Sequence, residues 1–472
     1  MLLKTWGTSE VLNGSAIEEI YGKALRVLKD IGVRVENKWM VDRLVSHGAQ
    51  SKEPFVVTFP EHLMDDMIRN ALPFDWEGVP ELSFTAGANP QYYMAAGTDH
   101  VCENTLASIE RLTKLADRLE HVSRIHLMGA ASDILPALTP LYARVIGWKY
   151  IANTKFDCCE IWDDDTIDYV SEMVDEYKAE SGQTENGNLL DAVVYLISPL
   201  CFKAMEADRF EKCYKKGFNI SVSSLCSAGG TAPVTLAGAL VQNLAELLFV
   251  NLLDRVFYNK NSLVIGNRIG IMDMKSAMFP YGRPEIGITN LAMGNIARHL
   301  KAEYISNSFS ADAKLPSSEA GMQKSISAIT GILAGSTNFY TMGLLSIDEI
   351  VSEEQLVIDN EFVGMLKRLA RGFELDEETM AFDVIKEVGP GGLFTATEHT
   401  LLNYRTEHWQ PDIFSREMYG SWVAKGKRTD RDLAAKRVQE LLAKEQPSGI
   451  SAGAEKRLLA IVDRAKNKLE NK

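Results

Sequence analysis

The chain has 472 residues, of which 46% are hydrophobic and 24% are charged, a profile typical of a folded globular protein. Its formal net charge is -14, with 64 acidic residues against 50 basic ones. Nucleic acids and anionic membrane surfaces bind proteins with excess positive charge, so we expect neither as a partner. The first residues lack a signal-peptide core and we find no uninterrupted apolar run of about 18 residues, so we expect a cytoplasmic protein.

The first part of the chain predicts helices followed by a hairpin. Amphipathic helical patterns lie at residues 15–32, 37–48 and 63–72. An extended stretch over residues 82–104 is broken by Gly and Pro turns, which favours a hairpin. We therefore predict that residues 1–105 form a cap of helices and a hairpin that packs on the main domain.

From residue 106 onward, helical patterns alternate with short apolar strands. Seven strands, each preceded by a helix, are predicted at residues 124–130, 155–162, 190–200, 218–230, 262–271, 303–310 and 338–345. Such strands fit a parallel sheet that is buried on both faces. An eighth strand is predicted at residues 391–397, after a helical insertion, and would complete a TIM (β/α)8 barrel over residues 106–405.

A charged helical tail is expected over residues 406–472. The alternative to the barrel is an open doubly wound sheet. No GxGxxG sequence follows the first predicted strand and no Walker loop occurs, so phosphate-bearing cofactors have no signature here.

Common catalytic and metal-binding motifs are missing from the sequence. There is no GxSxG and no HExxH, and no Ser/His/Asp grouping can be inferred from spacing. The six cysteines form no CxxC pair, so we expect reduced thiols and no bound metal.

Three residues stand out by their predicted positions. His126, in the first predicted strand, is interpreted as a satisfied buried histidine rather than a base. His399 follows the predicted eighth strand, near the reactive rim of a barrel, where function and loop anchoring are equally open. Arg268 follows an apolar run, where its charge should meet a carboxylate. A protein carboxylate is slightly favoured over a ligand carboxylate as that partner.

A series of short motifs runs in order along the chain. They include SPLCF (198–202), AGGTAPVTLAGAL (228–240), MDM (272–274), YGRPE (281–285), DAKLPSSEAG (312–321), LVIDNE (356–361), EVGPGGLF (387–394) and EHTLLNYRTEHWQP (398–411). Together they resemble the trimethylamine methyltransferase family, over essentially the whole chain. The resemblance implies a TIM barrel that moves a methyl group from a methylamine or quaternary amine to the cobalt of a corrinoid (cobalamin) carried by a separate small protein.

One loop indicates the branch of the family. Trimethylamine-specific members have pyrrolysine in the loop before the LVIDNE-like helix, and our alignment places Ile347 at that position. The chain therefore resembles the non-pyrrolysine branch, whose members demethylate betaines such as glycine betaine, proline betaine, carnitine and γ-butyrobetaine. The resemblance implies a small corrinoid-binding protein and a quaternary amine as partners and no cofactor held tightly by this chain. We also expect a homo-oligomer.

This chemistry explains why no acid–base motif is visible. A Co(I) corrinoid is itself a nucleophile and a quaternary ammonium leaves as a neutral amine, so no general base is needed. The protein must hold the cation, for which aromatic faces contribute about 0.5 to 2 kcal/mol each, and bind the remote carboxylate. Arg268 is the leading candidate for that anchor and Lys314 the second. Candidates for the cation site are Tyr92, Tyr93, Phe202, Phe309, Phe394 and Trp409.

Two other functions remain open at this point. One is a barrel that binds a betaine without catalysis, as a sensor or scaffold. The other is sugar or carbonyl chemistry, which would need paired carboxylates at the strand ends. The candidates for such a pair are Asp312 with Asp348 or Glu349, which we interpret as exposed or loop-anchoring acids.

Overall fold

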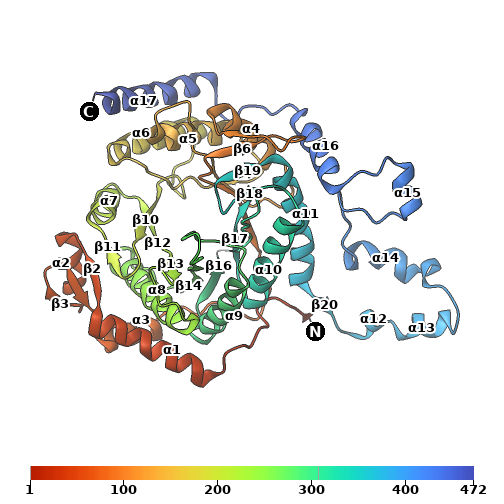
Figure 1. Ribbon diagram of the computed structural model, residues 1–472, viewed down its shortest axis with the longest axis horizontal. Coiled ribbons are helices and arrows are strands. Elements are labelled where there is room, and N and C mark those ends of the chain that lie inside the picture. The colour runs from red at the N-terminus through yellow and green to blue at the C-terminus, as the bar shows by residue number, and fades with distance from the viewer. Residues whose placement is uncertain (1, 307, 472) are drawn as a thin grey trace.

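The computed structural model describes residues 2–306 and 308–471, and its centre is a ring of eight parallel strands, each followed by a helix (Figure 1). The strands are β5 (Ser83–Ala88), β8 (Arg124–Met128), β9 (Lys155–Phe156), β10 (Asp191–Leu196), β12 (Asn219–Ser224), β14 (Val264–Asn267), β16 (Glu303–Ser306) and β17 (Asn338–Met342). The helices are α4 (Leu106–Ala116), α5 (Thr139–Tyr150), α6 (Ile167–Ser181), α7 (Ala204–Lys215), α8 (Leu236–Tyr258), α9 (Pro284–His299), α10 (Ser318–Ala334) and α11 (Glu353–Arg371). The predicted TIM (β/α)8 barrel is confirmed.

The strand order follows the chain order. β5 pairs with β8 on one side and with β17 on the other, so the first and last strands are neighbours. β8 pairs with β9, β10 with β12, and β14 with β16. β12 and β14 continue as β13 (Cys226–Ala228) and β15 (Ile269–Ile271), which pair with each other. A backbone bond from Val193 to Cys159 joins β10 to the end of β9, and bonds from Thr337 to Tyr304 and from Tyr340 to Ser308 join β17 to β16 and the residues after it.

The predicted eighth strand at residues 391–397 is wrong. Residues 391–396 are exposed, and the stretch contains only the 3-10 turn η4 (Phe394–Ala396). The missing strand is β5, in the stretch that we predicted as a hairpin. Phe84 of β5 is fully buried and stacks on Phe339 of β17 at 4.6 Å between ring centroids. Residues 1–105 thus supply the first barrel strand, and the predicted insertion between strands seven and eight instead follows the last strand.

The inner face of the strand ring is polar and partly open. Along β8, β10, β16 and β17, buried residues alternate with partly exposed ones. Tyr304 donates to Asn290 of α9, so the buried positions of β16 face the helices and its partly exposed positions face the barrel axis. A TIM-barrel interior is normally filled by apolar layers. Here the inward-facing residues, which we call the lumen, remain accessible.

The N-terminal helices were predicted correctly and cover one side of the barrel. This part comprises β1 (Leu2–Leu3), α1 (Gly14–Arg26), η1 (Val27–Ile31), β2 (Val33–Val35), α2 (Lys38–Ser46), β3 (Gln50–Glu53), β4 (Val56–Thr58) and α3 (Glu61–Arg69). The Asn13 and Asn37 side chains cap α1 and α2. A small sheet joins β2, β3 and β4 to β11 (Cys201–Phe202), so this cap is fixed to the loop after β10.

A second small sheet lies next to the carboxyl ends of β5 and β17. It contains β6 (Tyr92–Met94), β7 (Val101–Glu103), β18 (Leu344–Leu345) and β19 (Ile350–Ser352). This sheet ties the loop after the first barrel strand to the loop after the last one.

The one-turn helices η2 (Pro136–Leu138) and η3 (Asp164–Thr166) precede α5 and α6.

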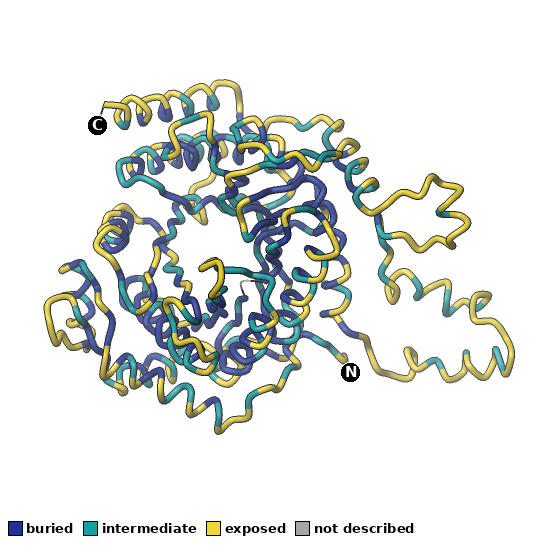
Figure 2. Tube along the Cα trace, in the orientation of Figure 1, coloured by how far each residue is buried: buried dark blue, intermediate teal, exposed yellow. Residues whose placement is uncertain are grey.

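The C-terminal part is helical, as predicted, but it is not uniform. It contains β20 (Phe373–Glu374), α12 (Glu377–Met380), α13 (Phe382–Val388), η4, α14 (Glu398–Glu407), α15 (Tyr419–Ala424), α16 (Asp430–Leu442) and α17 (Ala452–Glu470). α16 packs on α11, and α17 packs on α5 and α6. α12 to α15 contain no buried residue and run out from the body (Figures 1 and 2).

Helix α8 is the most apolar element of the barrel. Within the described residues it is the one helix long and apolar enough to cross a membrane, but 67% of its apolar stretch is buried inside the protein. It packs on α1 and α3 of the cap and on the strands β12 to β15. Its composition is therefore that of a core helix covered on both sides.

Candidate active site in the barrel lumen

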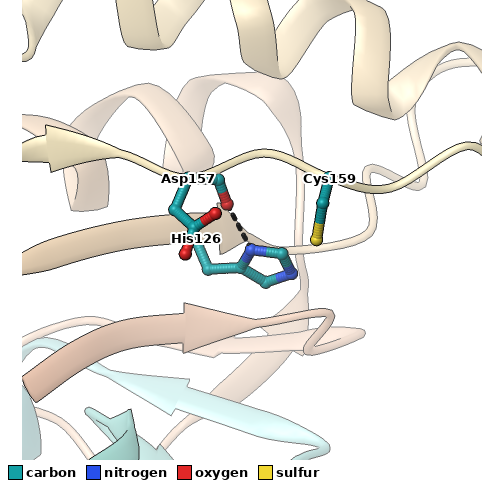
Figure 3. A group of neighbouring side chains, drawn as sticks. All are labelled: His126, Asp157 and Cys159. Atoms are coloured by element: carbon teal, nitrogen blue, oxygen red, sulfur yellow. Dashed lines mark hydrogen bonds between the residues drawn. The ribbon is translucent and has the colours of Figure 1, made fainter. Parts of the chain in front are cut away.

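A polar cluster lies where β8 and β9 meet the lumen. His126 occupies an inward position of β8, between the buried Ile125 and Leu127. Asp157 follows β9 directly, and its backbone carbonyl contacts Nδ1 of His126 (Figure 3). Nε2 of His126 lies 3.5 Å from the Glu160 carboxylate. The strand pairing of β8 with β9 thus brings an imidazole and a carboxylate together inside the barrel.

Glu160 is the centre of this cluster. Its carboxylate accepts hydrogen bonds from Asn89 at 3.4 Å, Tyr195 at 3.4 Å and Trp162 at 3.3 Å. Burial by itself would raise the pKa of Glu160, but the hydrogen bond and charge of His126, with the other donors, lower it below its usual value. The other donors come from the loops after β5 and β9 and from β10, so with His126 of β8 the cluster connects four consecutive strands of the barrel.

The interaction between His126 and Glu160 should make the stability of the protein depend on pH. Burial opposes the imidazolium form, but Glu160 and the Asp157 carbonyl raise the pKa of His126 above its ordinary value of 6.5. Its stabilising contribution is therefore complete below pH 6.5 and is lost as pH rises through the raised pKa. The stabilising contribution of Glu160 is complete above its ordinary pKa of 4.5, and it is lost as pH falls through the lowered pKa. We expect the pair to stabilise most from pH 4.5 to 6.5.

The substitution Glu160→Gln tests the pairing of His126 with Glu160 directly. Without the carboxylate, the buried imidazole loses its main support, so the pKa of His126 should fall below that of the wild type. Histidine ring NMR signals, assigned with His126→Gln, would report that shift. An unchanged pKa of His126 in Glu160→Gln would contradict the pairing.

His126, Asp157 and Cys159 could also be considered as metal ligands. One ligand atom from each lies within 4.8 Å of the others (Figure 3). However, Glu160 already faces His126, and Arg124 lies 3.5 Å from the Asp157 carboxylate. Burial raises the pKa of the Cys159 thiol well above its usual value, which disfavours the thiolate that metals bind. The absence of a resident metal stays a prediction, which elemental analysis of the purified protein would check.

Arg268 lies between β14 and β15, and its side chain belongs to the lumen. Gly266 lies two residues earlier, on the same face of the strand, and Nε of Arg268 is close to it. Because Gly266 has no side chain, it leaves room for the guanidinium. Burial raises the pKa of Tyr304 and Tyr340, and the charge of Arg268 acts against both shifts, so the guanidinium lies near these two rings. No described carboxylate forms an ion pair or hydrogen bond with its guanidinium. The slightly favoured protein carboxylate is therefore not found.

Ile347 lies in the loop after β18, near the rim. Its backbone N–H donates to the Ala311 carbonyl at 2.8 Å, and its φ of 72° is in the left-handed region. Tyr92 and Tyr93 lie nearby on β6 and point to opposite faces. Tyr92 is exposed, whereas Tyr93 donates to Glu353 at 2.8 Å, so Tyr93 is already engaged.

Two predicted aromatic residues do not reach the lumen. Phe202 is fully buried against Phe210, in the packing between β11 and α7. Phe309 is fully buried too, and its ring lies 4.9 Å from the Lys324 ammonium, so it contacts a cation of the protein itself. Lys314 is exposed and donates to the backbone of Asp312 at 2.7 Å.

The remaining predicted residues lie outside the barrel. Phe394 and His399 are in η4 and α14, in the exposed segment, because the strand that should have placed them on the rim does not exist. Trp409 lines a surface hollow of about 440 Å³ beside α11, with Met365 and Leu369. The predicted position of Phe394 and His399 at the end of a barrel strand is therefore wrong, and a role of Phe394, His399 and Trp409 in the reaction stays a prediction.

Two of the three residues considered for a carboxylate pair, Asp312 and Glu349, anchor loops. Asp312 accepts hydrogen bonds from the backbone N–H groups of Tyr281 and Gly282, at 2.6 and 2.7 Å. Glu349 accepts from the Ser346 hydroxyl at 2.6 Å. These contacts agree with the interpretation of Asp312 and Glu349 as loop-anchoring acids.

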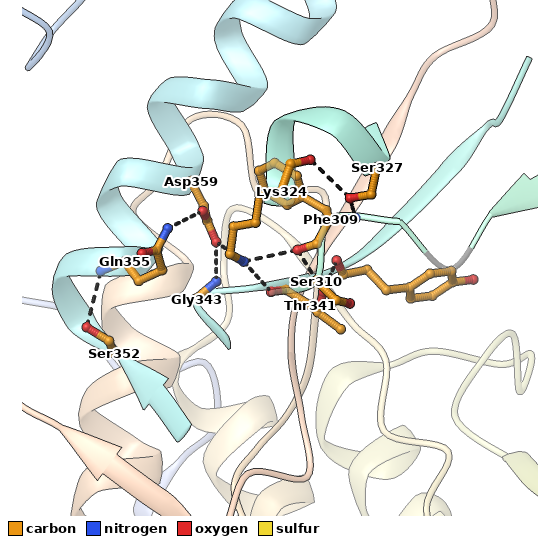
Figure 4. Close-up of polar contacts among 10 residues, drawn as sticks. Phe309, Ser310, Lys324, Ser327, Thr341, Gly343, Ser352, Gln355 and Asp359 are labelled. Atoms are coloured by element: carbon orange, nitrogen blue, oxygen red, sulfur yellow. Dashed lines mark hydrogen bonds and ion pairs between the residues drawn. The ribbon is translucent and has the colours of Figure 1, made fainter. Parts of the chain in front are cut away.

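A buried ion pair fixes the loops after β16 and β17 (Figure 4). Lys324 of α10 and Asp359 of α11 are both fully buried, 2.9 Å apart. Lys324 also donates to the carbonyls of Phe309 and Thr341, and Asp359 accepts from the Gly343 N–H. Phe309 and Thr341 have φ of 87° and 70°, which costs free energy in residues other than glycine. The ion pair holds this strained backbone next to the loop that carries Ile347.

Sequence reasoning missed Tyr195, Glu160 and Tyr340 as lumen residues. For the two tyrosines the signal was present, because polar or aromatic residues alternate with apolar ones in RIHLM, DAVVYL and NFYTM. A strand buried on both faces would be apolar throughout. The alternation indicates a barrel with a polar interior.

Comparison with known proteins places this chain in one family. Residues 1–470 match the family described as "Trimethylamine methyltransferase (MTTB)". The trimethylamine methyltransferase MttB of Methanosarcina barkeri is 29% identical over 372 residues, which cover 77% of this chain and 72% of that protein. The MttB of Desulfitobacterium hafniense (strain DSM 10664 / DCB-2) is 24% identical over 475 residues, 96% and 94% of the two chains.

The chain is also similar to two further methyltransferases. The glycine betaine methyltransferase of Desulfitobacterium hafniense (strain Y51) is 24% identical over 476 residues, 96% of each chain. The crystal structure of the Methanosarcina barkeri monomethylamine methyltransferase superposes with a TM-score of 0.47 and 10% identity, over 99% of this chain and 89% of that one. The printed sequence contains only the twenty ordinary amino acids. The chain therefore belongs to the trimethylamine methyltransferase family, in its branch without pyrrolysine.

Proposed function

We propose that this protein transfers a methyl group from a betaine, a quaternary amine with a carboxylate, to the Co(I) corrinoid of a separate small protein. Membership of the methyltransferase family and the similarity to a glycine betaine methyltransferase support the reaction class. The observation that carries the choice of substrate is Arg268, a guanidinium in the lumen without a described carboxylate partner. Arg268 is partly buried, and a cation that is partly removed from water is stabilised when an anion meets it.

Aromatic residues elsewhere in the lumen could bind the quaternary ammonium of a betaine. The rings of Tyr195 and Tyr340 occupy inward positions of β10 and β17, and Trp162 lies beside Glu160. Aromatic faces attract a quaternary ammonium, and each contributes about 0.5 to 2 kcal/mol. These three residues replace the six aromatic candidates that the sequence suggested. The proposed site therefore has an anion receptor and a cation-binding wall within one lumen.

The work of this chain is binding and orientation. The corrinoid supplies a cobalt nucleophile when its carrier docks at the mouth of the barrel, where the strands end. Arg268 holds the carboxylate, and the aromatic wall directs one N-methyl group toward the mouth. Because positive charge leaves the nitrogen during transfer, binding energy is better placed on the carboxylate than on the cation. No proton has to move, so His126 and Glu160 need only keep the lumen polar and ordered.

The compartment and the partner are part of the proposal. All six cysteines are unpaired, which is expected for a protein in a reducing compartment such as the cytoplasm. A Co(I) corrinoid also requires reducing conditions. The chain would act with a small corrinoid-binding protein and would hold no cofactor of its own.

The test is methyl transfer by the purified full chain to a Co(I) corrinoid protein, with a panel of betaines and choline as a cation that lacks the carboxylate. We expect conversion of the Co(I) spectrum to that of methyl-Co(III) with at least one betaine and none with choline. If no betaine of the panel gives methyl-Co(III), although a control shows that the corrinoid protein is active, the proposal is refuted.

Thermal unfolding with the same panel separates binding from catalysis. A ligand at about 100 times its Kd should stabilise the protein by about 2.7 kcal/mol. Stabilisation by a betaine without methyl transfer to any corrinoid protein would instead indicate a betaine-binding sensor.

A further inference from the structure

The loop between β15 and α9, residues 272–283, carries the motif MDM and the start of YGRPE, and we call it the rim loop. It lies at the mouth of the barrel, because it follows the carboxyl end of a barrel strand. Its tip, residues 274–278, is exposed. Its base is fixed, since Arg283 forms an ion pair with Asp273 at 3.0 Å and the Asp312 carboxylate accepts two backbone N–H groups of the loop. The rim loop is therefore held in a defined position at the mouth.

Phe279 of the rim loop turns back onto the inner face of β15. Ile269 and Ile271 of this strand are buried in the hydrophobic core, so Gly270 between them faces the lumen. A side chain at Gly270 would place its Cβ 1.4 Å from the nearest carbon of the Phe279 ring. The ring therefore fills the space that a side chain at this lumen position would need, and only glycine permits so close an approach.

This position puts the Phe279 ring on the mouth side of Arg268. Arg268 and Gly270 are two residues apart on the same face of the strand, which is about 7 Å along a strand. The strand runs toward the mouth, so Gly270 and the ring on it lie nearer the mouth than the guanidinium does. In a betaine whose carboxylate binds Arg268, the ammonium is only a few covalent bonds away. Because the reacting methyl group has to point toward the mouth, the ammonium comes next to Phe279.

The ring of Phe279 has an aromatic neighbour but no cation of the protein. Its centroid lies 5.5 Å from that of Tyr281, with 75° between the ring planes, an edge contact that supports its orientation. Within the described part of the chain no lysine or arginine lies over this ring, whereas Lys324 lies over that of Phe309. Phe279 is only half-buried, so part of its ring stays open to a ligand.

We propose that Phe279 determines the specificity of the lumen for a quaternary ammonium, by placing an aromatic face against its N-methyl groups. The inference rests on the proposed function, and it adds a ring from the rim loop to the three aromatic residues of the lumen. A neutral group of the same shape would pack on the ring but would lack the attraction between a cation and a ring face. Gly270 is then a positioning residue, which acts only through the place that it leaves for the ring.

Calorimetric binding to the full chain tests this inference without methyl transfer. Each betaine of the panel is compared with its neutral analogue, in which carbon replaces the nitrogen, as in 3,3-dimethylbutanoate for glycine betaine. We expect Phe279→Leu to weaken the binding of a betaine about 10-fold and to change the Kd of its analogue less than about two-fold. Phe279→Tyr keeps an aromatic face and should bind both ligands like the wild type.

Gly270→Ala tests the position of the ring while Phe279 itself stays in place. The added methyl group cannot share the space of the ring, so the ring has to move, and the Kd of a betaine should again rise about 10-fold. Met278→Leu is the matched control. Met278 precedes Phe279 on the same loop and is 49% exposed, so this variant should keep the wild-type Kd.

The outcomes separate this inference from the proposed function. Equal losses for a betaine and its neutral analogue in Phe279→Leu, or no loss for either, would overturn the role of Phe279 and leave the proposed function standing. A wild type that binds a betaine without transferring methyl would refute the proposed function, and the Kd values would still decide the role of Phe279. A wild type that binds no betaine of the panel would refute both. Thermal unfolding checks that each variant is folded, and if Phe279→Leu is not, Gly270→Ala decides.

Discussion

Arg268→Ala should raise the KM for a betaine about 100-fold while changing kcat only a few-fold. Removing one member of a buried charge pair typically costs about 2 to 5 kcal/mol. The carboxylate of a betaine lies at the far end from the reacting methyl group, so its bond to Arg268 is as strong in the bound substrate as in the transition state. A uniform loss of this kind appears in KM and not in kcat. Steady-state methyl transfer to the corrinoid protein measures both.

Lys314 supplies the matched control for this experiment. It was the second candidate for the anchor, but its side chain is exposed and bonded to its own loop. Lys314→Ala should therefore leave KM within about two-fold of the wild type, since exposed charges interact weakly. Arg268→Lys should recover part of the affinity, because it keeps the charge but loses the planar donor pair. An unchanged KM in Arg268→Ala would remove Arg268 as the anchor.

The alternation of helices and strands could be predicted because it depends on local patterns. The seven predicted helix–strand repeats correspond to β8 through β17, and the three N-terminal helices lie where their amphipathic patterns placed them. The identity of the remaining strand could not be predicted in this way. Both SFTAGA and GGLFTAT are short, small-residue stretches with one phenylalanine. Only tertiary pairing, with Phe84 stacked on Phe339, decides that the first is the strand.

The site was harder to predict for the same reason. Arg268 was found because a charge after an apolar run is informative by itself. The Glu160 cluster takes its donors from Asn89, His126 and Tyr195, which are far apart in sequence and meet only through strand pairing. Phe202 and Phe309 were chosen for their motifs, but residues that belong to a family motif can equally be packing residues. Both are fully buried in the structure.

Breaking the ion pair between Lys324 and Asp359 should have the largest effect on stability of any single change we consider. Both side chains have 0% exposure, and every donor of the ammonium is used, by Asp359 and by two backbone carbonyls. Asp359 in turn accepts from Gln355 and from the Gly343 N–H, each at 2.7 Å. Lys324→Met would leave a buried, uncompensated carboxylate, so the free energy of unfolding should fall by about 3 to 5 kcal/mol.

The exposed pair of Lys38 and Asp42 provides the control. These side chains are 2.7 Å apart, close to the 2.9 Å of the buried pair, but they are 80% and 61% exposed. Lys38→Met should change the free energy of unfolding by less than about 1 kcal/mol, as is usual for surface ion pairs. Urea unfolding followed by tryptophan fluorescence would compare the two variants under identical conditions. Equal effects of Lys324→Met and Lys38→Met would contradict the assignment of a special role to the buried pair.

A double variant distinguishes the ion pair from its packing. In Lys324→Met/Asp359→Leu neither charge remains, so the combined loss should be clearly smaller than the sum of the two single losses. The strained backbone at Phe309 and Thr341 would still lack the donor that holds their carbonyls. We therefore expect the double variant to recover much of its stability but not its activity, because the loop with Ile347 loses its fixed position on the rim. Recovery of both would mean that the pair serves stability alone, and that the loop after β17 is held by its other contacts.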